Sequence, residues 1–107
     1  MKLEFGRFES DCGTRQTQFY STAPPNFIFR DLRGYLTEKG AEFQQSDQMW
    51  RIRFTTQAGM RVACTLLKVD HERICVEFLR KNGDAFEFYE LYKEIALHLN
   101  VHNDAVL

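Results

Sequence analysis

The 107-residue chain contains no apolar run that approaches the roughly 20 residues needed to cross a bilayer, and its N-terminus lacks the basic and apolar segments of a signal peptide. It also has no excess of either charge, because 14 basic residues stand against 15 acidic ones. A protein dedicated to DNA or RNA normally has a basic excess, so we expect no direct binding of nucleic acid.

Cysteine is scarce, with three residues and no Cys-x-x-Cys pair, which indicates free thiols in a reducing compartment. We therefore expect a nuclear or cytoplasmic protein. Strand alternation places Cys64 on a core face and Cys75 on the opposite face of the next strand, half-exposed. A disulfide between these two cysteines is not expected, because their Cβ vectors point apart.

Catalytic and metal-binding motifs are missing as well. The sequence has no Gly-x-Ser-x-Gly motif and no phosphate-binding glycine loop, so we do not expect this chain to be an enzyme by itself. His98 and His102 have a spacing that can chelate zinc, but Leu99 stands where a His-Glu-x-x-His motif needs Glu, and no third ligand is near in sequence. We expect a solvated helix end, with no metal and no cofactor.

Apolar and aromatic residues are abundant: 44% of the chain is hydrophobic and it includes ten phenylalanines. This supports one compact domain, and the chain is too short for two. We predict that the domain spans residues 14–100. Residues 1–13 are expected to form a flexible arm or a segment that is not native to the protein, and residues 101–107 a loose tail.

The first part of the domain predicts a strand followed by a helix. Residues 14–22 are rich in β-branched and aromatic side chains, which favours a strand. Pro24 and Pro25 break that strand and suit the first turn of a helix. Gly40 is well placed to end the helix in the left-handed conformation.

From residue 41 the apolar period changes from that of a helix to two, which predicts strands. A short strand near 42–44 is followed by strands over 50–55, 61–66 and 74–79, with turns near 57–59 and 70–71. The residues expected on the core face are Trp50, Ile52, Phe54, Val62, Cys64, Leu66, Ile74, Val76 and Phe78.

A strand-to-helix junction follows. Gly83 allows a sharp turn, Asp84 can cap the free N–H groups of a helix, and Glu87 occupies the third position of a capping box. Phe88 begins an apolar stripe that ends at Leu99. The whole pattern predicts a two-layer α+β domain in the order β-α-β-β-β-β-α, with an antiparallel sheet of four to five strands and two helices on one face.

The outer face of that sheet carries Arg51, Arg53, Arg61 and Arg73, with Arg80 or Lys81 at the junction. These residues are either solvating, with cross-strand partners such as Glu77, or a basic platform for an anionic partner. The partner would be a phospholipid headgroup or an acidic protein surface. The apolar residues expected on the same face, which favour protein docking, are Leu67, Val69 and Leu79.

Two segments carry a family resemblance. The first, Arg-Gln-Thr-Gln-Phe-Tyr-Ser over residues 15–21, resembles the Arg-x-Thr-Arg-Phe-Phe-Thr motif that opens the kinase-associated-1 domain of DNA-damage checkpoint effector kinases. The second, residues 76–88, includes Gly-Asp-Ala-Phe-Glu-Phe and resembles the closing motif of the same domain. Gln18 departs from the family pattern, since a basic residue is expected there.

The resemblance implies a non-catalytic C-terminal regulatory domain of a serine/threonine kinase. Such a domain would bind the kinase domain of its own polypeptide and inhibit it until DNA-damage phosphorylation upstream relieves the contact. Other family members imply an alternative, a membrane-targeting module that binds anionic phospholipid. The resemblance does not imply an oligomeric state. The partner-binding residues implied by the two motifs are Arg15, Gln18, Phe19, Tyr20, Arg80, Lys81, Gly83, Asp84 and Phe88.

Overall fold

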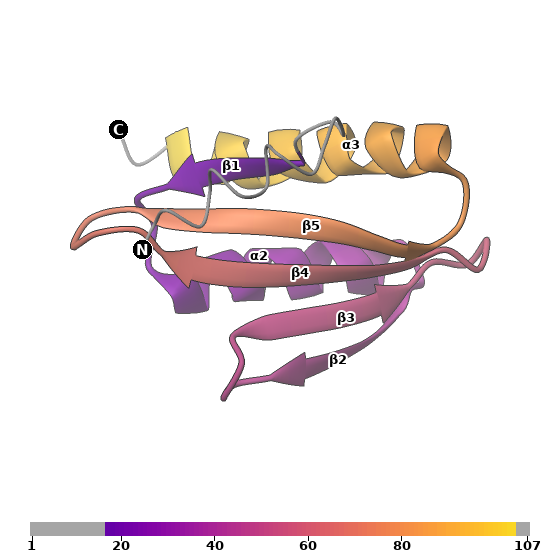
Figure 1. Ribbon diagram of the computed structural model, residues 1–107, viewed down its shortest axis with the longest axis horizontal. Helices are drawn as coiled ribbons and strands as arrows, with labels where there is room; N and C mark the ends of the chain where they lie inside the picture. Colours follow the sequence, from indigo (N-terminus) through magenta and orange to yellow (C-terminus); the bar gives the residue numbers. More distant parts are fainter. Residues whose placement is uncertain (1–16, 105–107) are drawn as a thin grey trace.

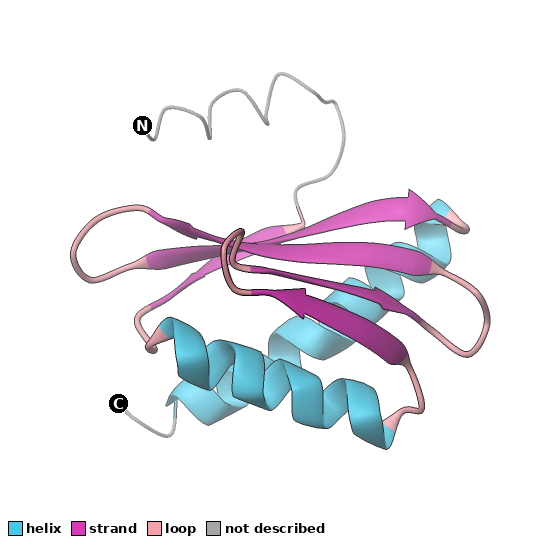
Figure 2. Ribbon diagram, turned by 90° about the horizontal axis from the view of Figure 1, so that it is seen from below, coloured by secondary structure: helices cyan, strands magenta, loops and turns pink. Residues whose placement is uncertain are grey.

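The computed structural model describes the backbone of residues 17–104 and the side chains of residues 17–99. A five-stranded antiparallel sheet forms one layer and two helices form the other, both on the same face of the sheet (Figure 1 and Figure 2). The elements are β1 (Gln18–Ser21), α2 (Pro25–Glu38), β2 (Glu42–Ser46), β3 (Arg51–Thr55), β4 (Arg61–Lys68), β5 (Ile74–Asn82) and α3 (Ala85–Asp104). The predicted fold class and element order are confirmed.

The strand order across the sheet is β1-β5-β4-β3-β2, so the first strand pairs with the last. Strands β2 to β5 form a meander of antiparallel neighbours, and β1 completes the sheet beside β5. β1 and β2 are therefore the two edges. Because β1 pairs with the strand that leads into α3, the two motifs of the family resemblance lie side by side (Figure 1).

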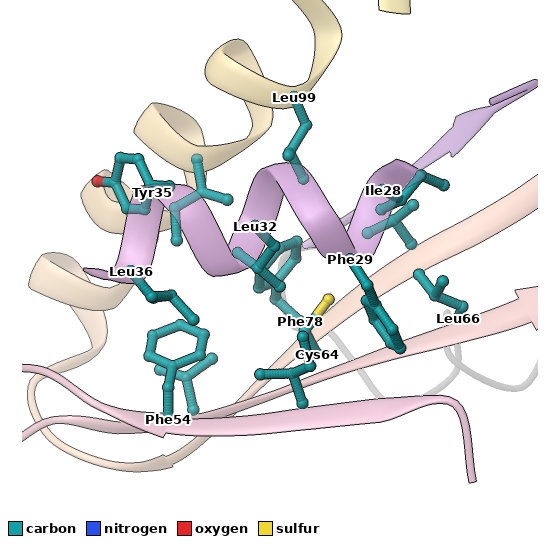
Figure 3. Close-up of a cluster of buried hydrophobic side chains, with 14 of the residues drawn as sticks. Ile28, Phe29, Leu32, Tyr35, Leu36, Phe54, Cys64, Leu66, Phe78 and Leu99 are labelled. Carbon is teal, nitrogen blue, oxygen red and sulfur yellow. The ribbon is translucent and has the colours of Figure 1, made fainter. Parts of the chain in front are cut away.

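The core fills the space between the sheet and the helices. α2 lays its apolar stripe on the strands, and Leu99 of α3 points toward α2 (Figure 3). Burial of this apolar surface is the dominant stabilising contribution to the fold. The largest fully buried side chains are Phe29, Phe78, Leu32, Leu36, Ile52, Ile95, Leu99, Val62 and Val76, with Cys64 and Cys75.

The predicted ends of α2 are confirmed. Pro24 occupies the N-cap position, and its carbonyl accepts from the backbone N–H of Ile28 at 3.2 Å. Gly40 has a φ of +75° just after the helix, a conformation that an L side chain rarely adopts. The next amide, that of Ala41, donates to the carbonyl oxygen of Leu36 at 2.9 Å, which closes the C-terminus of the helix.

Trp50 is the first correction, because it was predicted to begin a strand on the core face. It instead closes a tight turn, donating its backbone N–H to the carbonyl oxygen of Asp47 at 3.3 Å with a φ of +50°. Its side chain is 40% exposed, although its ring centroid lies 5.9 Å from that of Phe29. β3 therefore begins one residue later, at Arg51.

Cys75 is the second correction, because it was predicted to be half-exposed and it is fully buried. It occupies β5, which has neighbours on both sides, and it is in register with Tyr20 on β1 and Leu67 on β4. Both of these cross-strand neighbours have larger side chains than the thiol and flank it on either side. Alternation alone, which assigns a face, cannot report this lateral cover.

The first strand and the last helix have different ends from those predicted. The first strand begins at Gln18, whereas the sequence predicted a start near residue 14. The last helix continues to Asp104, so the backbone of 101–104 is helical where a loose tail was predicted. Arg15, the 1–13 arm and residues 105–107 lie outside the described residues.

Candidate functional site

The first motif places consecutive side chains on opposite faces of β1. Phe19 is in register with the core residue Val76, and its ring centroid lies 6.5 Å from that of Tyr92 on α3. Tyr20 is in register with Cys75 on the outer face and is 44% exposed. The guanidinium of Arg73 lies 5.3 Å from the centre of the Tyr20 ring, a cation–π contact. Of this pair, Phe19 packs against the core, whereas Tyr20 places an exposed ring on the outer face.

Gln18 also lies on the outer face, half-buried and in register with Glu77 of β5. A neutral amide beside Glu77 leaves that region of the face less basic than the family motif implies. With Arg15 outside the described residues, Tyr20 is the described residue of the first motif that offers an exposed side chain.

The second motif is built to connect β5 to α3. Gly83 has a φ of +120°, and a Cβ there would come within 2.7 Å of Met60 Cγ. Asp84 Oδ2 accepts from the backbone N–H of Glu87 at 2.9 Å, which caps the helix as predicted. Phe88 is buried in the core. These three motif residues therefore have structural roles: Gly83 forms the turn, Asp84 caps the helix and Phe88 packs in the core.

Arg80 and Lys81 end β5 and have different roles. Arg80 Nη1 donates to the carbonyl oxygen of Gly83 at 2.8 Å, so this guanidinium is part of the junction. Lys81 sits at an irregularity of the sheet: Val62 is in register with Arg80 and Arg61 with Asn82, which leaves Lys81 as the extra residue of a β-bulge. Bulges redirect side chains at the ends of strands.

The predicted basic outer face is divided into separate parts. Arg73 lies at the β4–β5 turn, where its Nε is 3.1 Å from Asp70 Oδ2. Arg51 Nε donates to Thr65 Oγ1 at 3.1 Å in the middle of the sheet. Arg53 and Arg61 line an open groove at the opposite end from Arg73, together with Lys81.

We call this the cationic groove, formed by Arg53 on β3, Arg61 on β4 and Lys81 on β5, with Glu42 of the edge strand β2 at its rim. The sequence predicted both arginines on the outer face with Arg80 or Lys81 at the junction, but it did not decide which of these two cations joins them. The feature that selects Lys81 is its position as the extra residue of the β-bulge in β5, and this position becomes visible only when the strand register is known.

The apolar part of the outer face was also predicted. Leu79 is 50% exposed, whereas Leu67 and Val69 are half-buried. Both helices lie on the other face of the sheet (Figure 2). Leu79 and Tyr20 are thus exposed on an outer face that also carries arginines, a composition typical of protein interfaces.

Three titratable side chains of β4, β5 and the turn between them, those of Asp70, Cys75 and Cys64, have shifted pKa values. Backbone N–H groups of Glu72 and Arg73 donate to Asp70 and lower the pKa of its carboxyl, which therefore stays ionised beside Arg73. Burial raises the pKa of the Cys75 thiol to about 12, and burial also raises the pKa of Cys64. Both thiols are neutral near pH 7, so they are poor nucleophiles.

Among the residues that the structure describes, no group of three or more His, Cys, Asp or Glu residues could hold a metal ion. The helices within the described residues are too short or too polar to cross a membrane. What the outer face can do chemically is bind an anion at the cationic groove and apolar groups near Tyr20 and Leu79.

No protein-family model matches the sequence. No curated protein matches it either. Solved structures do match the fold. One is the crystal structure of the adenylate sensor from AMP-activated protein kinase in complex with 5-aminoimidazole-4-carboxamide 1-β-D-ribofuranotide. It aligns with a TM-score of 0.58 and 13% identity over 82% of this chain and 97% of that chain. This likeness is one of fold.

Proposed function

We propose that this chain is a non-catalytic regulatory domain of a serine/threonine protein kinase. It binds the kinase domain of the same polypeptide through its outer sheet face and lowers kinase activity until phosphorylation after DNA damage releases the contact. The observation that carries the proposal is the mixed character of that face, where Leu79 and Tyr20 are exposed, Tyr20 contacts Arg73, and both helices lie on the other face of the sheet (Figure 2).

Two further observations support a kinase context. The structure with the similar fold comes from AMP-activated protein kinase. The two sequence motifs that resemble the kinase-associated-1 domain are also adjacent on paired strands, β1 and β5. A domain with this role would be found where such a kinase acts, in the nucleus and the cytoplasm.

The test adds the 107-residue chain to the isolated kinase domain and measures phosphoryl transfer to a peptide substrate. We expect inhibition that saturates with the concentration of the added domain. The variant Leu79→Ser should weaken the inhibition, because it replaces an exposed apolar contact on the outer face. Unchanged kinase activity together with undetectable binding would contradict the proposal.

Leu97→Ser is the matched control. Leu97 is 66% exposed, but it lies on α3, in the helical layer. It undergoes the same chemical change as Leu79 without altering the sheet face, so inhibition should persist. Equal loss of inhibition in both variants would place the contact elsewhere than on the outer face.

A second candidate function is binding to anionic phospholipid. The observation in its favour is the cationic groove, whose three positive side chains could contact headgroups. Vesicle sedimentation with and without phosphatidylserine tests it. Electrostatic binding to vesicles should decrease steeply with salt, whereas apolar docking to a kinase domain should change little.

A further inference from the structure

The cations of the cationic groove differ from most other cations of the molecule. Elsewhere, basic side chains contact an acceptor: Arg30 with Asp31, Lys39 with Glu94, Arg73 with Asp70, Lys93 with Glu90, Arg33 with Gln45 and Arg51 with Thr65. Arg53, Arg61 and Lys81 make no ion pair or side-chain hydrogen bond to another described residue, yet they line one groove. Lys68, at the far end of β4, shares this property but is remote from the groove.

Holding three like charges in one place costs free energy through their mutual repulsion, unless a counter-charge arrives. The fold nevertheless brings them together from three neighbouring strands, and the β-bulge at Lys81 contributes the third. Glu42 is the acidic residue on the rim, so the groove carries three positive charges and one negative charge. A ligand with two negative charges matches the excess.

A phosphate monoester is the biological group with that charge, since it carries about −1.5 to −2 near pH 7. Its oxygens accept paired hydrogen bonds from the planar fork of an arginine, while a lysine adds a point charge. Arg53 and Arg61 supply two such forks and Lys81 the ammonium. The groove is open to the surface, so the phosphate can be presented by a larger molecule.

The position of the groove favours a polypeptide as that molecule. Glu42 and Gln44 of β2 form part of its lining, and β2 is an edge strand that pairs with β3 on one side. An edge strand can hydrogen-bond an added extended segment. A lipid headgroup has no backbone with which to pair with such an edge. A flat bilayer would contact cations spread over the whole sheet face, but two of these, Arg73 and Arg51, already have acceptors within the protein.

We propose that the groove of Arg53, Arg61 and Lys81 binds a phosphoserine or phosphothreonine side chain on an extended segment of a partner protein that lies along β2. This inference does not depend on a kinase domain being the partner of the outer face. If the chain is a kinase regulatory domain, the site gives it a way to sense phosphorylation directly.

The first experiment uses the 107-residue chain and a degenerate peptide library with phosphoserine or phosphothreonine fixed at its centre. We expect enrichment of phosphorylated sequences and, by calorimetry, at least a tenfold preference of the best peptide over its unphosphorylated form. Amide chemical shifts should change at the groove and along β2. An absence of enrichment, or equal affinity for both forms, would overturn the proposal.

The second experiment removes the cations one at a time. Arg53→Gln, Arg61→Gln and Lys81→Gln should each weaken binding of the best peptide roughly tenfold, as expected for loss of one charge-assisted hydrogen bond. Lys68→Gln is the matched control, with the same change of charge on β4 but away from the groove, and should stay within about twofold. Thermal unfolding of each variant checks that these exposed substitutions leave the fold intact.

Two probes separate a phosphopeptide site from other anion sites. Vesicles that contain phosphatidylinositol 4-phosphate should bind less tightly than the best peptide. Vesicle binding that is lost in the groove variants, with no peptide enriched, would reassign the groove to lipid. Inorganic phosphate alone should bind more weakly than the best peptide. If the two had equal affinity, contacts of the peptide with β2 would contribute nothing to binding, which would contradict the proposed binding along β2.

Discussion

The guanidinium of Arg80 donates to the carbonyl oxygen of Gly83 at 2.8 Å, across the turn that joins β5 to α3. Gly83 adopts a φ of +120°, and the next residue, Asp84, caps the helix through the backbone N–H of Glu87. One side chain therefore holds the strand end while the next residues start the helix. Most residues of this second motif therefore have a structural role in the junction. Lys81 is the motif residue that lines the cationic groove, where it can contact a ligand.

Gly83→Ala should destabilise the protein. The added Cβ would come within 2.7 Å of Met60 Cγ, and a φ of +120° is strained for any L side chain. We expect a loss of about 1–3 kcal/mol in the free energy of unfolding, measured by urea denaturation.

Gly34→Ala is the control for that substitution. Gly34 lies within α2, and a Cβ there would meet nothing within 4 Å. Removing glycine from a helix interior should raise the free energy of unfolding by about 0.5–1 kcal/mol. If both variants changed stability in the same direction, the strain assigned to Gly83 would be incorrect.

Asp84→Ala should cost about 0.5–2 kcal/mol, because the substitution leaves the N–H of Glu87 without its side-chain acceptor at the start of α3. Asp84→Asn keeps an acceptor oxygen and should recover most of the lost stability. Chemical denaturation and amide exchange in the first turn of α3 measure both effects. An alanine variant as stable as the asparagine variant would show that the cap contributes little.

Local signals made most of the fold predictable. The change of apolar period from helical to two near residue 41 identified the meander, and Pro24 and Gly40 identified the ends of α2. These signals come from neighbours in sequence, which determine turns, caps and strand faces. The location of both helices on one face followed, since most large apolar side chains of the strands were predicted on one face of the sheet.

Lateral contacts between strands were not predictable in the same way. Cys75 is buried because Tyr20 and Leu67, from distant parts of the chain, flank it in register. Trp50 leaves its strand to close a turn with Asp47, although its type favours a strand. Lys81 joins the cationic groove through a one-residue bulge, and such an irregularity in register leaves no periodic pattern in the sequence.

Adjacent positions on β5 should respond very differently to substitution. Phe78 is 1% exposed and its ring packs 5.6 Å from that of Tyr92, whereas Leu79 on the other face is 50% exposed. Phe78→Ala should cost about 3–5 kcal/mol. Leu79→Ser should stay within about 0.5 kcal/mol. Thermal unfolding measures both, and a large loss in Leu79→Ser would mean that part of the chain covers the outer face.

Alkaline pH should destabilise the protein, because thiol and phenol groups that the fold buries ionise more readily once the chain unfolds. Burial raises the pKa of Cys75 and that of Tyr92, each to about 12, and burial raises the pKa of Cys64 too. In the unfolded chain a thiol ionises near pH 8.5 and a tyrosine near about 10. The unfolded state therefore binds fewer protons than the folded state above about pH 8.5. The free energy of unfolding is thus unaffected by these groups below that pH and decreases as the pH rises toward about 12.

Urea denaturation at intervals from about pH 7.5 to about pH 10.5 should show a midpoint that falls as the pH rises. The free energy of unfolding should decrease by up to about 1.4 kcal/mol per pH unit for a fully buried thiol. The double variant Cys64→Ala/Cys75→Ala has no thiol in the core to ionise on unfolding. It should be less stable at neutral pH because of the cavities, yet its stability should decline less steeply with pH. An identical slope in the wild type and the variant would show that the buried thiols do not cause the alkaline loss.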